Sequence, residues 1–348
     1  MPSLSRITML VVAACLLLSS PAWTTTAIPA HQFDQAQAAY KAKDYARAMD
    51  LWRPLAVGGH GDAQANLGNL YALGLGVAKD PARAAKWYRK AAEQGHAKSQ
   101  TDLGIIYFFG RGVKRDVDQA VHWHRRAGRQ GSLVSQTALA VMYDNGNGVA
   151  RDYAKAAKWY ALAARQGDAY AQNVLGARYQ FAKGVDRDVQ LAVKWYELAA
   201  AQGAVLAQFN LGFLYEQGNG VAQNSARAVK WYEMAARQGD AEAQHKLALH
   251  YARGLGVGQN IDAARSWYLK SAAQGHAISQ TNLGIMYVKG KGVVRDLVTA
   301  YNYFAQAAEN GDNVGNKYRD LVAKHLTPAQ VLKAQRLIRD RNKAGHLK

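Results

Sequence analysis

Apolar and small residues recur along most of this chain at spacings of three and four residues, the pattern of a helix with one buried face. Leu211 and Tyr215 mark such a face between residues 204 and 217. Ala228, Trp231 and Tyr232 mark another, on a second segment that follows a Gly-rich break at 218–221. The pattern therefore predicts two helices joined by a short connection.

This helix pair recurs every 36 residues, and no insertion breaks the period. Four residues keep their place in every copy: Gly (Gly59, Gly95, Gly131, Gly167, Gly203, Gly239, Gly275, Gly311), Gln (Gln64, Gln100, Gln136, Gln172, Gln208, Gln244, Gln280), Leu (Leu67, Leu103, Leu139, Leu175, Leu211, Leu247, Leu283) and Tyr (Tyr71, Tyr107, Tyr143, Tyr179, Tyr215, Tyr251, Tyr287). One hairpin cannot bury its apolar face alone, so we expect the copies to stack on one another.

Each second helix has its own start and stop signals. Asp or Asn stands where the helix needs an N-cap, at Asp80, Asp116, Asp152, Asp188, Asn224, Asn260 and Asp296. Pro81 follows the first of these, and Pro suits the first helical position. At the other end Gly239 and its equivalents predict a left-handed C-cap.

The repeated pattern Ala-x-x-x-Leu-Gly-x-x-Tyr, Gly-x-Gly-Val, Ala-x-Lys-Trp-Tyr-x-x-Ala-Ala-x-Gln-Gly resembles the Sel1-like repeat family, a branch of the tetratricopeptide-type solenoids. The resemblance implies an all-α fold, a right-handed superhelical solenoid of helix hairpins. It also implies adaptor or scaffold roles, frequent in bacterial envelope regulation, secretion and polysaccharide assembly. The departures are small: Ala182 replaces a loop Gly, Ala140 and Ala248 replace helix Gly, and Tyr303 and Phe304 replace Trp-Tyr.

Four segments follow from this period. We expect a signal peptide over residues 1–27, an N-terminal capping hairpin over 28–59, seven repeats over 60–311 and basic capping helices over 312–348.

The first residues have the pattern of a secretory signal, with Arg6 before an apolar run from Ile7 to Leu18 and small residues near Ala22. The run is short for a membrane span, and no later segment replaces it. The residues before Cys15 resemble a lipobox, but the apolar run continues past the cysteine, which favours an ordinary signal over a lipid anchor. We expect an exported protein, periplasmic or secreted.

The chain carries few signs of chemistry. Cys15 is its single cysteine, so we expect no disulfide or thiolate metal site if the signal is removed. The Gly-x-Gly segments follow helices rather than strands, which argues against a dinucleotide. His122 and His124 point to different sides of a helix and cannot share a metal easily. We expect no catalytic residue, cofactor or metal.

Some cysteine-rich members of the Sel1-like repeat family have been associated with penicillin binding and β-lactamase activity. A β-lactamase-like hydrolase is therefore a hypothesis for this chain, ranked third, after a protein scaffold and a glycan-binding protein. The sequence has neither Ser-x-x-Lys nor Lys-Thr-Gly, and it lacks the cysteines of those members.

A solenoid usually binds its partner along one face, so variable positions on the first helices are the candidates. The predicted partner-binding residues are Phe109, Tyr170, Val174, Phe181, Leu206, Phe213 and Arg253. The surface that these positions form is apolar in the middle repeats and polar or basic at its ends, which is typical of a peptide groove. The alternative is that these side chains fill contacts between successive first helices.

The formal net charge is +19, and residues 317–348 carry nine Lys or Arg against two Asp. Such a surface favours anionic partners. The leading hypothesis is a non-catalytic scaffold of the cell envelope that binds a protein along the first-helix face. The alternative is binding of an anionic envelope polysaccharide or peptidoglycan by the basic surface. We expect no nucleic-acid partner, because the chain has no recognised binding motif for one.

Overall fold

The computed structural model describes residues 31–345, which form eighteen α-helices and no strand. The predicted all-α solenoid of helix-hairpin repeats is confirmed. The described residues divide into two compact units, 31–91 and 92–345. None of the described helices has the length and hydropathy of a membrane span. The predicted signal peptide and Cys15 lie outside the described residues.

The first unit contains α1 (Gln32–Lys41), α2 (Tyr45–Val57), α3 (Gly61–Leu73) and most of α4 (Pro81–Glu93). Its core centres on the buried Trp52, whose ring centroid lies 6.4 Å from that of Phe33 and 5.5 Å from that of Tyr40. The α1–α2 hairpin is thus held together by aromatic contacts, with no counterpart of the Gly-rich connection found in the repeats.

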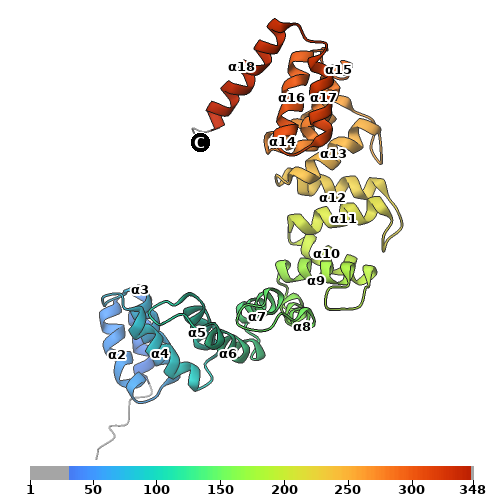
Figure 1. The fold of residues 1–348 in the computed structure, drawn as a ribbon. Helices are drawn as coiled ribbons and strands as arrows, with labels where there is room; N and C mark the ends of the chain where they lie inside the picture. Colours follow the sequence, from blue (N-terminus) through green and yellow to red (C-terminus); the bar gives the residue numbers. More distant parts are fainter. Residues whose placement is uncertain (1–30, 346–348) are drawn as a thin grey trace, which may run out of the picture. The chain divides into compact units, whose positions relative to one another are not determined.

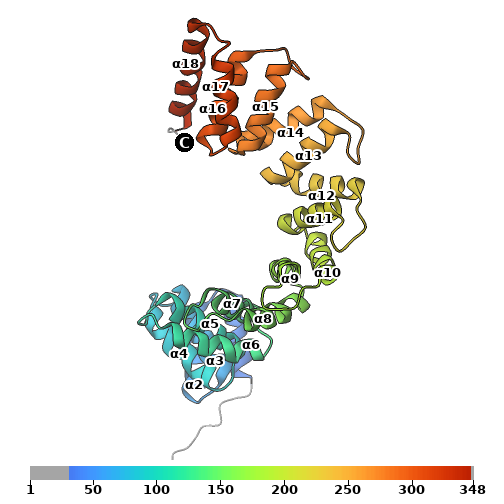
Figure 2. The same ribbon diagram turned by 45° about the vertical axis from the view of Figure 1, so that its right-hand side comes forward.

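In the second unit, helix hairpins follow one another in chain order (Figure 1, Figure 2). The first helices of these hairpins are α5 (Ala97–Phe109), α7 (Leu133–Asn145), α9 (Ala169–Phe181), α11 (Val205–Gln217), α13 (Ala241–Arg253), α15 (Ala277–Lys289) and α17 (Asn313–Ala323). The second helices are α6 (Val117–Arg129), α8 (Tyr153–Arg165), α10 (Val189–Ala201), α12 (Ser225–Arg237), α14 (Ile261–Ala273) and α16 (Leu297–Glu309). The last helix, α18 (Pro328–Gly345), packs against α16.

The predicted N-caps are present. The Asn224 side chain accepts a hydrogen bond from the Arg227 backbone N–H at 2.9 Å, and the Asp or Asn that begins each other second helix accepts an equivalent bond. Each cap satisfies a backbone donor that the first turn of a helix leaves unpaired.

The second helices differ from expectation in two details. In α12, Trp231 is half-buried and Val229 is buried with Ala228 and Tyr232, because the buried stripe is rotated about the helix axis toward Val229. The helix ends at Arg237, and Gln238 rather than Gly239 is its C-cap. Gly239 follows with φ +99°, so it turns the chain after the cap.

Close contact between the two helices of a hairpin depends on the repeated small residue of the first helix. A Cβ atom built on Gly212 would lie 2.6 Å from the Tyr232 ring, well inside van der Waals contact. Gly176 and Tyr196 make the same contact, at 2.8 Å. The tyrosine of the second helix therefore packs flat against the backbone of the first.

Buried glutamines connect each hairpin to the one before it. The Gln208 side chain donates to the Ala200 carbonyl at 3.2 Å, near the end of the preceding second helix, and accepts from the Gln238 side chain at 2.8 Å. The donor bond recurs at Gln64, Gln100, Gln136, Gln172, Gln244 and Gln280. The acceptor bond recurs from Gln130, Gln166, Gln202, Gln274 and Asn310. We call this series the glutamine ladder.

Replacing one rung of the glutamine ladder should destabilise the chain. We expect Gln208→Met, which keeps the side-chain volume, to lower the free energy of unfolding by about 2 kcal/mol, because the Ala200 carbonyl loses its side-chain partner inside the protein. Urea denaturation measures this change. Gln217→Met, on an exposed glutamine of the same helix, is the control and should change stability by less than about 0.5 kcal/mol.

Seven described first helices, α3 included, end on a residue in the left-handed region, which is Ala182 in α9, with φ +55°, and Gly in the others, at Gly74, Gly110, Gly146, Gly218, Gly254 and Gly290. We expect Ala182→Gly to stabilise the chain by about 0.5 kcal/mol, since relief of the strained φ exceeds the entropy that Gly adds to the unfolded state. A thermal unfolding curve measures it. Ala177→Gly, within the same helix, should instead destabilise by about 1 kcal/mol.

Candidate binding face

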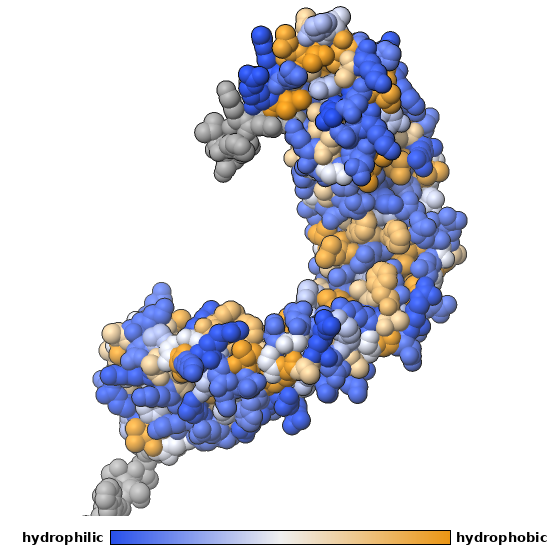
Figure 3. Space-filling model, in the orientation of Figure 1, coloured by the Kyte–Doolittle hydropathy of each residue, from blue (hydrophilic) through white to orange (hydrophobic). Residues whose placement is uncertain are grey.

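The predicted partner-binding residues lie at different depths along the first helices. Phe181 is 70% exposed and Phe109 59%, and Tyr170 and Leu206 are exposed to a similar degree. Val174 is half-buried, Phe213 is at the border of exposure, and Arg253 is exposed at the end of α13. Apolar surface also shows between polar residues over the hairpins α9 to α12 (Figure 3).

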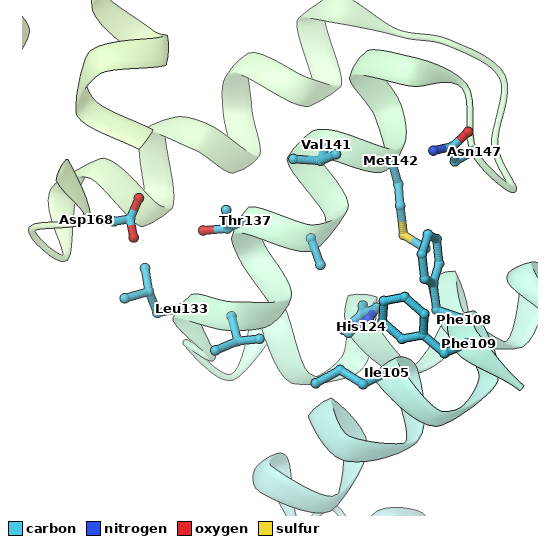
Figure 4. Close-up of a pocket in the computed structure, with 12 residues that line it drawn as sticks. Ile105, Phe108, Phe109, His124, Leu133, Thr137, Val141, Met142, Asn147 and Asp168 are labelled. Carbon is cyan, nitrogen blue, oxygen red and sulfur yellow. The ribbon is translucent and has the colours of Figure 1, made fainter. Parts of the chain in front are cut away.

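A cavity of about 490 Å³ opens between the first helices α5 and α7. Ile105 and Phe109 contribute from α5, and Thr137 and Val141 from α7 (Figure 4). Its remaining lining residues are Phe108, His124, Leu133, Val134, Ala138, Met142, Asn147 and Asp168. Of the predicted residues, only Phe109 lies in this cavity.

The cavity lies where two residues depart from the repeat. In other hairpins a tyrosine of the second helix reaches a polar side chain near the end of the first: Tyr196 donates to Gln180 and Tyr232 to Glu216, each at 2.7 Å. The equivalent pair here is His124 and Phe108. The imidazole is shorter than a phenol and Phe108 offers no acceptor, so the pair leaves apolar space instead of a hydrogen bond.

His124 is 2% exposed, and its Nδ1 lies 3.1 Å from the Ser135 hydroxyl oxygen. Burial lowers the pKa of His124 to about 4, because a charged ring would lose its hydration there. Near neutral pH the side chain is therefore an uncharged part of the cavity wall.

Polar bridges cross the same face at the hairpins that follow. Arg178 on α9 pairs with Asp144 on α7 at 2.7 Å, and Lys246 on α13 pairs with Glu216 on α11 at 3.1 Å. Glu216 also lies 3.6 Å from the buried His250. Contact with His250, followed by the bonds from Tyr232 and Lys246, lowers the pKa of Glu216 to about 2, against the opposing effect of burial. The carboxylate therefore stays ionised, and the bridge holds α11 and α13 together.

A second cavity, of about 260 Å³, lies between α13 and α15. Its residues Leu249, Ala252, Tyr268, Ile285 and Met286 are the equivalents of Ile105, Phe108, His124, Val141 and Met142, four repeats of 36 residues further along the chain. It has Ala252 where two other hairpins have Gln180 and Glu216 as the acceptor of the tyrosine hydrogen bond. The two cavities thus lie at equivalent positions in two different pairs of successive repeats.

The sequence reasoning missed Ile105, Val134, Ala138 and Val141, which line the first cavity. Their signal was available, because they hold the same repeat positions as the predicted Phe213, Tyr170 and Val174. Val134 is 56% exposed although it is apolar. The replacement of tyrosine by His124 is the second signal, visible as soon as the repeats are aligned.

The described residues contain no group of three His, Cys, Asp or Glu side chains placed to hold a metal ion. His122 is exposed and His124 is buried, which fits their predicted separation on the helix.

Comparison with known sequences decides the family. The Sel1 repeat matches seven times, at residues 61–96, 97–132, 133–168, 169–203, 205–240, 241–276 and 277–312. The chain belongs to the Sel1 repeat family. Proteins built on Sel1 repeats generally mediate protein–protein interactions, and the scaffold is generally non-catalytic.

Two solved structures are similar to this Sel1 repeat chain. A Sel1 repeat protein from Oxalobacter formigenes is 33% identical, with 84% of this chain and 88% of that one covered and a TM-score of 0.64. A protective antigen of uropathogenic Escherichia coli strains is 30% identical, with 89% and 83% covered and a TM-score of 0.48. The comparison with curated proteins gave no match.

The depressed pKa of His124 predicts a pH dependence. The unfolded chain takes up a proton near pH 6.5 and the folded chain only near 4, so stability falls as the pH drops between these values. We expect His124→Phe to reduce the loss between pH 7 and pH 5 by roughly 1–2 kcal/mol, measured by urea denaturation. Phe304 holds the equivalent position over Gly284, so the ring fits. His122→Gln, on an exposed histidine, should leave the pH dependence unchanged; an equal effect of both variants would contradict the assignment.

Proposed function

We propose that this Sel1 repeat protein is a non-catalytic scaffold that binds an extended segment of a protein partner along the face of its first helices. In this proposal an apolar side chain of the segment enters the cavity between α5 and α7. One observation carries it: this cavity of about 490 Å³ is lined mainly by apolar side chains and opens on the variable face of two successive repeats.

The chemistry of the cavity favours a protein side chain over a sugar. Ile105, Val134, Ala138 and Val141 offer apolar contacts, while Thr137 and Asp168 supply polar groups at its edge. An anchor residue buried in such a pocket supplies most of the binding energy in many interfaces. A volume of about 490 Å³ has room for a large aromatic or aliphatic side chain and its neighbour.

The frame around the cavity suits a scaffold. Gln100 and Gln136, the rungs on α5 and α7, are buried, and each donates one hydrogen bond and accepts another. A partner segment would therefore meet side chains already held in place, and binding would cost little ordering of the scaffold. We place the protein in the cell envelope, on the secretory signal that residues 1–27 resemble.

Peptide selection tests the proposal. Peptides of about ten residues, selected by display against the full chain, should bind at about 0.1 M and about 0.5 M NaCl alike, since apolar contacts are not screened. Val134→Asp and Phe109→Asp should each weaken binding at least tenfold, about 1.4 kcal/mol, by placing a charge in the cavity. Calorimetry measures both effects.

Leu198→Asp is the matched control, because Leu198 is an exposed apolar residue on a second helix, away from the cavity. It should leave the affinity unchanged. Peptides that bind all three variants equally would refute the groove. Selected ligands that bind only at low salt would instead favour the basic surface and an anionic glycan.

A further inference from the structure

The cavity between α13 and α15 combines an apolar wall with a cationic rim. Leu249, Ile285 and Met286 form part of the wall, beside the buried Tyr268. Arg253 from the end of α13 and Lys289 from the end of α15 line it, together with Lys291 of the following turn. No Asp or Glu is among the lining residues.

Arg253, Lys289 and Lys291 form no ion pair with any carboxylate among the described residues, and all three are exposed. Elsewhere on the same face cations are paired, as Lys246 is with Glu216 and Arg178 with Asp144. The positive charge at this cavity is thus available to an external anion.

The equivalent cavity between α5 and α7 shows what has changed. Phe109 there corresponds to Arg253 here, Asn147 to Lys291 and Ala138 to Asn282, while Val141 and Met142 keep apolar counterparts in Ile285 and Met286. Both cavities therefore have an apolar wall, but only the α13–α15 cavity has a cationic rim. A ligand that fits both parts has an apolar group next to an anionic one.

We propose that the α13–α15 cavity binds an apolar side chain of the partner segment together with an adjacent carboxylate, which Arg253, Lys289 and Lys291 hold. Arg can hold a carboxylate through two parallel hydrogen bonds, and lysines add point charges. A volume of about 260 Å³ suits one large apolar side chain. A polysaccharide fits less well, because its hydrated rings would gain little from contact with the apolar wall of Leu249 and Ile285.

The carboxylate has two possible sources, an internal Asp or Glu and the terminal carboxylate of the segment.

The proposal rests on the proposed function in one respect, that the ligand is a peptide. The cavity can nevertheless be tested separately, because each cavity is lined by its own methionine, Met142 between α5 and α7 and Met286 between α13 and α15.

The experiment records methyl NMR spectra of the full chain labelled at methionine methyl groups. Three hexapeptides serve as probes: one ending in leucine with a free carboxylate, one with Asp-Leu and an amidated end, and one with Asn-Leu and an amidated end. We expect the Met286 signal to shift with at least one of the first two, and the Asn peptide to bind at least tenfold more weakly. The peptide that binds more tightly identifies the source of the carboxylate.

Variants define the site. Arg253→Ala with Lys291→Ala should weaken the carboxylate peptide at least tenfold, while Lys230→Ala, on an exposed lysine of a second helix, should leave it unchanged. Arg253→Phe with Lys291→Asn copies the rim of the other cavity and should remove the preference for the carboxylate. Both double variants should keep the unbound Met142 signal in place, which verifies folding.

An Asn peptide that binds as tightly as both carboxylate peptides, or no Met286 shift with any peptide, would overturn the proposal. A shift produced by oligogalacturonate and by no peptide would also overturn it and would assign the cavity to an anionic glycan. Failure of the proposed function is recognised separately, because none of the peptides selected against the full chain would then shift the Met142 signal.

Discussion

The buried glutamine of each first helix is the interaction on which the rest of the structure depends. Its amide is removed from water, so its donor and its acceptor must both find partners. The donor reaches the end of the preceding second helix, as Gln208 reaches Ala200, and the acceptor receives the side chain of Gln238, at the end of the second helix of the same hairpin. A slip of one residue between neighbouring hairpins would leave these groups unpaired. The ladder thus fixes both the 36-residue period and the spacing of successive hairpins.

With the frame fixed in this way, function falls to the few side chains that meet between successive first helices. A tyrosine and a polar partner close the face at Tyr232 and Glu216, and an ion pair crosses it at Asp144 and Arg178. Where the partner is Phe108 or Ala252 the face stays open as a cavity. Closed and open sections therefore differ by one or two residues on an unchanged backbone, which is how a uniform solenoid acquires distinct sites.

Much of the fold could be predicted from the sequence, because helix periodicity, N-caps such as Asn224 and the fixed period are local or repeated signals. The cavities could not, since they depend on which side chains meet across two helices. His124 and Phe108 are sixteen residues apart, and neither is unusual alone. The predicted residues Phe181 and Leu206 are exposed, yet exposure does not show a pocket. Nor does the sequence reveal that the repeated Gln pairs with carbonyls.

The strict period has a consequence for how this chain can change over generations. Because every hairpin presents the same ladder contacts to its neighbours, unequal exchange between two repeats of one gene would add or remove a whole hairpin without disturbing any join. Because each cavity is lined by two successive hairpins, such an exchange would also place the hairpin of Phe109 or of Arg253 beside a new neighbour. The order of binding preferences along the protein can therefore be reshuffled by recombination alone, before any point mutation alters a single side chain.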